Sequence, residues 1–280
     1  MEAGFRESRV AMIIIGERIN ATRKPIARAI NDLDEGHIAE EVKAQDETKS
    51  EYIDLNGGTD GADREREIAN LAWLIDIALR TTEKKFALDS SDPAVLEAGL
   101  AHLNGRREVM LNSVNGEPDR LEQMMPVAAK HHCPVIALAM DANGIPKTAD
   151  ERLAVCESIA SAAEKSGVPE AHLFFDPLVL PLVSDATQVR ITLDTLRRIK
   201  ARFPEAKTTM GVSNVSHGLP KRTAINEALL ITALASGLDS AICDPTRDGI
   251  RRAIALGDLL AGNDRHCRRY SRQARKGEIR

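Results

Sequence analysis

The sequence predicts a single-domain α/β protein, a (β/α)₈ TIM barrel. Short apolar runs recur eight times along the chain, and segments with helical spacing and charged outer faces separate them. Brief continuous apolar runs are typical of strands that are buried on both faces. The chain has 280 residues, and a barrel of this kind takes about 250. Regular strand–helix alternation without a break in composition therefore favours one closed parallel barrel.

The expected strands are the eight apolar runs, and each of them ends in polar or glycine residues. In chain order they are Met12–Ile15, Tyr52–Leu55, Phe86–Leu88, Val109–Leu111, Val135–Ala139, Leu173–Phe175, Thr208–Val212 and Ala241–Cys243. Between them, apolar residues repeat at intervals of three and four, as in 68–79 and 153–163, which predicts helices that pack one stripe on a sheet. An open doubly wound sheet is the competing fold. It is disfavoured because Gly16-Glu17-Arg18, after the first strand, is not a glycine-rich phosphate turn.

The predicted organisation is a flexible N-terminus over residues 1–11, a barrel over 12–262 and a basic tail over 263–280. The tail is rich in arginine and has few apolar residues. A solvated extension and a docking segment are both open interpretations of it.

Composition excludes several classes of function. The formal charge is −4, and without a strongly basic domain we expect no nucleic-acid partner. The four cysteines are scattered without a Cys-x-x-Cys pair, so we expect neither a zinc ribbon nor a redox motif, and a reducing cytoplasm is the predicted location. No run approaches the roughly 20 apolar residues that a membrane-spanning helix needs, and we expect no membrane partner.

Acidic and amide side chains stand at the predicted strand ends, where barrels of this type place their active sites. Neither a lysine for a Schiff base nor a cluster of histidines for a metal accompanies them, so we expect no bound metal. Such a ring suits a flat heterocycle with paired N–H donors, for example the pyrimidinone half of a pterin. Capping of the next helix is the competing role at each single position, as at Ser91 or Asp92 before Pro93. The polar residues at these ends are Glu17, Asn20, Asp54, Asn56, Asp89, Asn112, Asp141, Asp176, Asn214 and Asp244.

The same stretches carry a family resemblance. From about Met12 to about Leu260 the chain resembles the pterin-binding methyltransferases that act on methyltetrahydrofolate and a corrinoid, and it is also similar to the folate module of cobalamin-dependent methionine synthase. Gly211–Ser216 followed by Gly218-Leu219-Pro220 is the most specific match. The other matching stretches are Ile14–Asn20, Ile53–Asn56, Leu88–Ser90, Asn112–Asn115, Asp176–Leu178, Arg222, Asn226, Gly237–Asp239 and Ala241-Ile242.

The resemblance implies a dihydropteroate-synthase-like barrel with assigned residues. Asp89, Asn112 and Asp176 hold the pterin ring, and Asn214, the catalytic residue, lies near N5 of the folate. Arg222 reaches the folate carboxylate tail or a bound water, or else it braces its own loop. Matches that we rank lower, because polar residues also stabilise a barrel mouth, are Glu17, Asn20, Asp54 and Asn56. His217 lies in the Asn214 loop, and we favour solvent exposure over a contact with the corrinoid.

The implied reaction moves a methyl group between N5 of tetrahydrofolate and the cobalt of a corrinoid, in either direction. The sequence has no Asp-x-His-x-x-Gly cobalamin motif, so the corrinoid is expected on a partner protein. The resemblance also implies a homodimer. A dihydropteroate synthase is one alternative. It is disfavoured because Gly211–Val215 lacks the basic residues that such synthases carry at this strand. A non-catalytic folate-binding protein is the other, and the presence of Asn214 argues against it.

Overall fold

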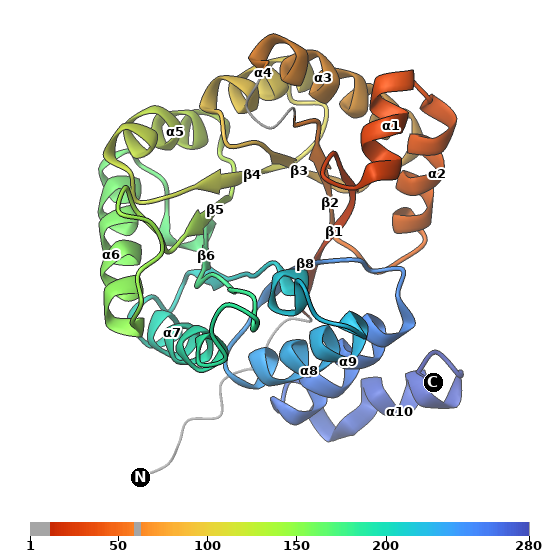
Figure 1. Cartoon of the computed structure of the whole chain (residues 1–280), viewed down its shortest axis with the longest axis vertical. Coiled ribbons are helices and arrows are strands. Elements are labelled where there is room, and N and C mark those ends of the chain that lie inside the picture. Colours follow the sequence, from red (N-terminus) through yellow and green to blue (C-terminus); the bar gives the residue numbers. More distant parts are fainter. Residues whose placement is uncertain (1–11, 59–62, 280) are drawn as a thin grey trace.

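Eight parallel strands form a ring, and the helices surround it (Figure 1). The computed structural model describes residues 12–58 and 63–279; the predicted flexible N-terminus, residues 1–11, lies outside them. Neighbouring strands pair in the order β7-β6-β5-β4-β3-β2-β1-β8, which confirms the barrel and not the open sheet. The strands are β1 (Ile13–Asn20), β2 (Tyr52–Asn56), β3 (Lys85–Asp89), β4 (Val109–Val114), β5 (Val135–Leu138), β6 (Leu173–Asp176), β7 (Lys207–Thr208) and β8 (Ser240–Cys243).

The helices follow the predicted pattern, and several of them begin at a side-chain cap. Thr148 and Glu151 form a reciprocal capping box at the start of α6, and the Asp92 side chain accepts from the Ala94 N–H at the start of α4. Asp92 is therefore a cap, as one of the two predicted readings had it. The helices are α1 (Lys24–Asp32), α2 (Glu35–Asp46), α3 (Arg64–Thr81), α4 (Pro93–Leu103), α5 (Pro118–His131), α6 (Ala149–Lys165), α7 (Gln188–Arg202), α8 (Arg222–Ala235), α9 (Asp248–Leu260) and α10 (Arg268–Arg275), with short 3₁₀ turns η1 (Glu170–His172), η2 (Val212–Ser216) and η3 (Arg265–Cys267).

Strand side chains alternate between the two faces, and this separates two layers of core. The outward residues pack under the helices, for example Ile53, Leu55 and Leu88. The inward residues form a compact plug inside the barrel. Because side chains two positions apart share a face, the residue that follows each inward apolar side chain by two also points into the ring. The inward plug consists of Ile15, Tyr52, Ala87, Met110, Ile136 and Phe174.

The ring closes differently from the prediction at β7. The predicted strand Thr208–Val212 was too long, because β7 ends at Thr208 and Val212 begins the 3₁₀ turn η2. Between β7 and β8 the backbone contributes one bridge, Gly211 to Ile242, and the Ile242 N–H donates to Met210 O at 2.9 Å. The Ser240 hydroxyl adds a bond of 3.0 Å to Thr208 O. We call this part of the ring the β7–β8 seam.

Other strands differ from their predicted bounds at the ends. β5 stops one residue early, at Leu138, whereas β1 continues to Asn20 and β4 to Val114. Glu17, Asn20 and Asn112 therefore lie within strands and not after them. A strand can include polar residues at its open end, where the apolar rule that predicted its bounds no longer applies.

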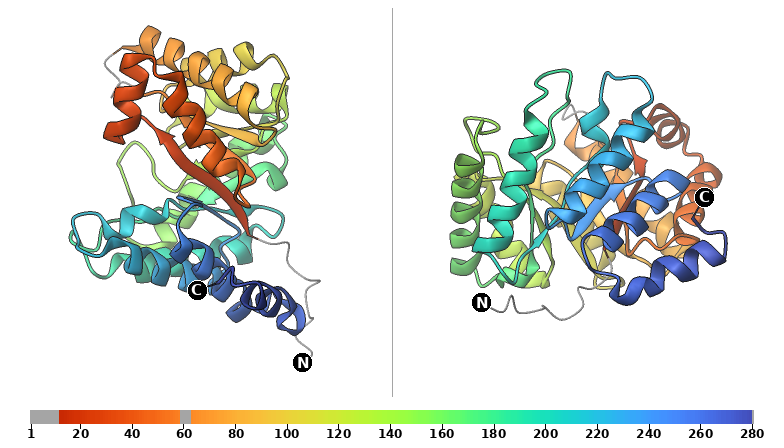
Figure 2. Two further views of the ribbon diagram at one scale, coloured as in Figure 1. Left: turned by 90° about the vertical axis from the view of Figure 1, so that its right-hand side faces the viewer. Right: turned by 90° about the horizontal axis from the view of Figure 1, so that it is seen from below.

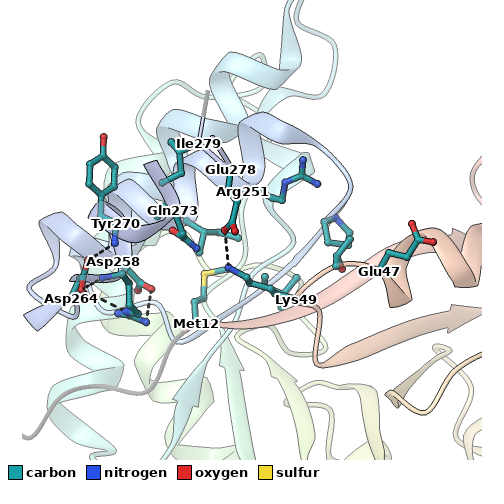
Figure 3. Close-up of a pocket in the computed structure, with 16 residues that line it drawn as sticks. Met12, Glu47, Lys49, Arg251, Asp258, Asp264, Tyr270, Gln273, Glu278 and Ile279 are labelled. Carbon is teal, nitrogen blue, oxygen red and sulfur yellow. Dashed lines mark hydrogen bonds and ion pairs between the residues drawn. The ribbon is translucent and has the colours of Figure 1, made fainter. Parts of the chain in front are cut away.

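The arginine-rich tail folds back beside α9 (Figure 2). The Asp264 carboxylate accepts from the N–H groups of Arg269 and Tyr270 at 2.9 and 2.8 Å, and Arg269 pairs with Asp258. A cavity of about 510 Å³ lies between this segment and the outside of β1 (Figure 3). Its lining includes Met12, Lys49 and residues of α9 and α10 such as Asp258 and Tyr270, so it lies on the outside of the barrel and not in the mouth. No helix in the described ranges is long and apolar enough to cross a membrane.

Candidate active site

Six of the sequence-predicted residues line the mouth of the barrel just above the apolar plug. Each follows an inward side chain of its own strand by two residues: Glu17 follows Ile15, and Asp89 follows Ala87. The strand pairing sets Asp89 directly beside Asn112 and Leu138 beside Asp176. The plug thus forms the floor of the site, and the polar residues form its wall. These residues are Glu17, Asp54, Asn56, Asp89, Asn112 and Asp176.

The two carboxamides hold two of the carboxylates. Asn112 Nδ2 donates to Asp54 Oδ1 at 3.1 Å, and Asn56 Nδ2 donates to Asp89 Oδ2 at 3.0 Å. Asn56 is also fixed through its own Oδ1, which accepts from the Gly58 N–H at 3.0 Å. Each carboxamide donates one N–H to a neighbouring carboxylate, so the side chains of the wall are held in place before any ligand binds.

Asp176 is held by backbone groups. Its Oδ1 accepts from the Leu178 N–H at 2.7 Å, and the Gly211 N–H lies close enough to lower the pKa of this carboxyl as well. The fully buried Arg152 lies near enough to favour its charged form. Burial nevertheless dominates and raises the pKa of Asp176 from 3.8 to about 7. This carboxylate needs further N–H donors to compensate its loss of water.

The remaining acids crowd one another. Burial, with the nearby Asp244 adding to it, raises the pKa of Glu17 from 4.5 to about 7. Burial also raises the pKa of Asp89 to about 6, and the pKa of Asp54 is raised well above 3.8 by burial and then by the charge of Asp89. Like charges at the mouth therefore favour a bound proton or a ligand that supplies N–H groups.

The segment that carries Asn214 lies beside this wall. Ser213 and Asn214 belong to η2, and the Ser213 hydroxyl lies close enough to the Glu17 carboxylate to lower its pKa against the larger effect of burial. Arg222 donates from Nη2 to Ser213 O at 2.8 Å and from Nε to Ser216 Oγ at 3.0 Å. Arg222 thus makes the loop-bracing contacts, one of its two predicted uses. Asn214 and His217 are both exposed, the latter as favoured from the sequence.

Asn20, a predicted site residue, has a local structural role, and three residues that influence the site were not predicted. Asn20 Oδ1 accepts from the N–H and the hydroxyl of Thr22, which shapes the turn after β1. The strand end at Asp244 had no role assigned, yet Asp244 adds to the raised pKa of Glu17. Ser213 stood inside the recognised motif without a function. Nothing in the sequence indicated that Arg152 lies near the site, because an arginine beside an apolar helical stripe is ordinarily on the solvent-exposed face of the helix.

The donor set suits a neutral heterocycle that carries paired N–H groups. In the part of the chain that the structure describes, no group of three or more His, Cys, Asp or Glu side chains is arranged to hold a metal ion. Carboxylates with raised pKa values, flanked by carboxamides, can accept paired N–H groups and exchange protons near neutral pH.

Comparison with known proteins agrees with this geometry. The family model described as "Pterin binding enzyme" matches residues 16–244. The chain is 32% identical to the methylcorrinoid:tetrahydrofolate methyltransferase of Eubacterium limosum, over 96% of this chain and 98% of that one. It is 31% identical to the methionine synthase of Mycobacterium tuberculosis over 83% of this chain, which corresponds to 20% of that longer protein.

Solved structures of similar fold include two dihydropteroate synthases. The enzyme of Coxiella burnetii, in complex with pteroic acid, has a TM-score of 0.68 at 14% identity and covers 90% of this chain and 94% of its own. That of Stenotrophomonas maltophilia has a TM-score of 0.65 at 17% identity, with 89% and 93% covered. At these identities the likeness concerns the fold. From the family match and the full-length relative together, the chain belongs to the pterin-binding enzymes, in the family of the methylcorrinoid:tetrahydrofolate methyltransferase.

Proposed function

We propose that this protein is a Co-methyltransferase that moves a methyl group between N5 of tetrahydrofolate and the cobalt of a corrinoid carried by a partner protein. The observation that carries the proposal is the wall of buried, preoriented carboxylates and carboxamides above a closed apolar floor. Such a wall matches the amino and ring N–H groups of a pterin, and the full-length relative is named for this reaction.

In this proposal Asp89, Asn112 and Asp176 bind the pterin ring. Asp176 has its backbone donors on one side and accepts the ring N–H and the exocyclic amine through its remaining lone pairs. Asn112, already donating to Asp54, offers its carbonyl oxygen to a ring donor. Binding then relieves the desolvation of Asp89 and Asp176, because each gains a further N–H partner beside the one that it already has.

Asn214 is assigned to the reacting atom. The charge on N5 changes as the N–C bond forms or breaks. A hydrogen bond from an amide donor to N5 is therefore stronger in the transition state than in the ground state. Donors of this kind are worth about 2.7–4 kcal/mol, or 10²–10³ in rate. The exposure of Asn214 fits a site that a second, large cofactor must approach from outside.

The test is direct transfer in both directions. The protein is mixed with methyltetrahydrofolate and cob(I)alamin, or with tetrahydrofolate and methylcobalamin, and the cobalamin absorption spectrum is followed. Transfer supports the proposal, whereas tight folate binding without any transfer identifies the non-catalytic alternative. Asn214→Ala is expected to lower turnover about 10²–10³-fold and folate affinity only a few-fold. Equal losses in both quantities contradict the assigned role.

A dihydropteroate synthase, the alternative function, would need an anion-binding site at the β7–β8 seam. A pyrophosphate leaving group needs cations or several N–H donors, yet Gly211–Val215 offers no basic side chain. The rest of the proposal follows the family resemblance: a cytoplasmic homodimer with the corrinoid protein docked at the open mouth. Sedimentation of the purified protein tests the dimer, and co-sedimentation with the corrinoid protein tests the docking.

A further inference from the structure

The chain turns directly after Asp176, the last residue of β6, and this turn has an unusual backbone. Leu178 has a φ of +66°, in the left-handed region that costs free energy for a residue with a side chain. A residue keeps such a conformation only where the surrounding structure holds its backbone. The turn that carries Asp176 into the mouth therefore depends on contacts from other elements.

Two completely buried side chains, from two different helices, supply these contacts. Arg152 of α6 donates from Nη1 to Pro177 O at 2.8 Å and to Leu178 O at 3.0 Å. Thr192 of α7 donates from its hydroxyl to Leu178 O at 2.8 Å. The carbonyl groups on both sides of the Leu178 Cα are thus held, which fixes the left-handed conformation between them.

One peptide group connects Arg152 to Asp176. The Pro177 carbonyl and the Leu178 N–H belong to the same planar unit and point in opposite directions. The carbonyl accepts from Arg152, and the N–H donates to Asp176 Oδ1 at 2.7 Å. Because the unit is rigid, holding the carbonyl also fixes the direction of the N–H. When Asp176 is ionised, opposite charges at the two ends of this dipole strengthen both bonds.

Thr192 differs from the next buried threonine of α7 in the partner of its hydroxyl. Thr195 donates to Ile191 O of its own helix at 2.8 Å, a common partner for a threonine within a helix. Both threonines are completely buried, so exposure does not distinguish them. The Thr192 hydroxyl stabilises the turn after β6, whereas the Thr195 hydroxyl stabilises α7 alone.

We propose that Arg152 and Thr192 are positioning residues that hold the Asp176 carboxylate toward the exocyclic amine and ring N–H of a pterin and thereby select this heterocycle over lumazine. Lumazine has a carbonyl where pterin has the exocyclic amine. The inference rests on the proposed function, in which Asp176 accepts these two N–H groups.

The selectivity follows from the rigidity of the carboxylate. A carboxylate held toward the amine position forms a hydrogen bond with pterin but meets the carbonyl oxygen of lumazine, which it repels. A carboxylate that can turn away avoids part of this repulsion and loses part of the bond. Loosening the turn is therefore expected to weaken pterin binding more than lumazine binding.

The test measures the dissociation constants of pterin and lumazine at pH 7.5 by calorimetric titration, for the wild type and three variants. The decisive quantity is the ratio of the two constants, because partial unfolding affects both ligands equally and leaves the ratio unchanged. Thr192→Val removes the hydroxyl at nearly constant shape. It is expected to lower the preference for pterin about three- to tenfold, as loss of one hydrogen bond implies.

The other two variants separate the hydroxyl from the packing of α7. Thr192→Ser retains the hydroxyl and is expected to restore the wild-type ratio to within about twofold. Thr195→Val is the matched control and should leave the ratio unchanged, because its hydroxyl does not contact the turn.

The inference is overturned by a wild-type ratio in Thr192→Val, or by an equal loss of preference in Thr192→Ser or Thr195→Val. If Thr192→Val does not fold, Arg152→Lys decides, since lysine keeps the cation but lacks the planar fork. A lowered ratio then supports the inference, and a wild-type ratio refutes it. A wild-type protein that does not bind pterin, or does not prefer it to lumazine, refutes the role of Asp176 in the proposed function instead.

Discussion

Replacing Arg152 with methionine is expected to lower the free energy of unfolding by about 3–5 kcal/mol. Arg152, on α6, is completely buried. Its guanidinium donates to Pro146 O at 3.0 Å, to Pro177 O and Leu178 O at 2.8 and 3.0 Å, to Thr192 Oγ1 at 3.4 Å and to Gln188 Oε1 at 2.8 Å. A buried charge is thus stabilised mainly by carbonyl dipoles, and the charge of Asp176 adds to them.

The magnitude follows from what methionine leaves behind. Bonds to a charged donor are worth about 1.5–3 kcal/mol each, and a simple sum over all of them would approach the whole stability of a domain, about 5–15 kcal/mol. The bonds also compensate the cost of burying the cation, which the variant no longer bears. The net loss is therefore set by the carbonyl groups that lose their donor, at about 1–3 kcal/mol each before relaxation.

Urea unfolding followed by circular dichroism measures this loss. Arg198→Met on the neighbouring α7 is the matched control, because Arg198 forms exposed pairs with Asp150 and Asp194 that are worth less than about 1 kcal/mol. Weaker folate binding is also expected for Arg152→Met, since Pro177 and Leu178 directly follow Asp176. A loss of 1 kcal/mol or less, equal to that of the control, refutes the reasoning.

Three further predictions concern single positions. Because the pKa of Asp176 is raised to about 7, the folded chain keeps a proton between pH 4 and 7 that the unfolded chain releases. The wild type therefore loses stability as pH rises, and Asp176→Asn should become more stable than the wild type by up to about 4 kcal/mol at pH 8. Urea unfolding of both proteins at pH 5 and 8 checks this, and a stability difference that does not change with pH contradicts it. A Cβ on Gly16 would lie 2.3 Å from the buried Gln45 Oε1, so Gly16→Ala should cost about 1–3 kcal/mol in thermal unfolding, against no change if Gln45 simply rotates away. Arg222→Lys cannot hold Ser213 and Ser216 with a planar fork, so methyl transfer should fall about tenfold at unchanged folate affinity; a parallel loss of affinity would instead favour contact with the folate tail.

The barrel was predictable because buried parallel strands are continuously apolar. That rule identified all eight strands, but it failed at their polar ends. Inward polar residues such as Glu17 continue the alternation of β1 although they break its apolar run. The strand over Thr208–Val212 was overestimated for the opposite reason, since Val212 is buried in η2 against α8 and not in a strand.

The site was predictable in its members but not in its connections. Acids and amides at strand ends are visible in the sequence, and the roles of Asp89, Asn112, Asp176 and Asn214 remain predictions. The pairing of Asn112 with Asp54 depends on strand register, and the approach of Ser213 to Glu17 crosses from η2 to β1. Arg152 was not predictable, because its carbonyl partners belong to loops that fold over α6 only in the assembled barrel.

The β7–β8 seam divides the mouth into two parts with different resistance to local opening. β1 to β6 are joined by continuous backbone ladders, whereas η2 is attached by the Gly211–Ile242 bridge beside it, by one bond from the Leu182 N–H to Val215 O at 3.0 Å and by the two Arg222 contacts. Segments with few backbone bonds open at the lowest free energy. In amide hydrogen exchange we therefore expect residues 212–216 to exchange well before β2 to β5. The ring-binding wall would then stay fixed while the segment with Asn214 adjusts to the docking partner.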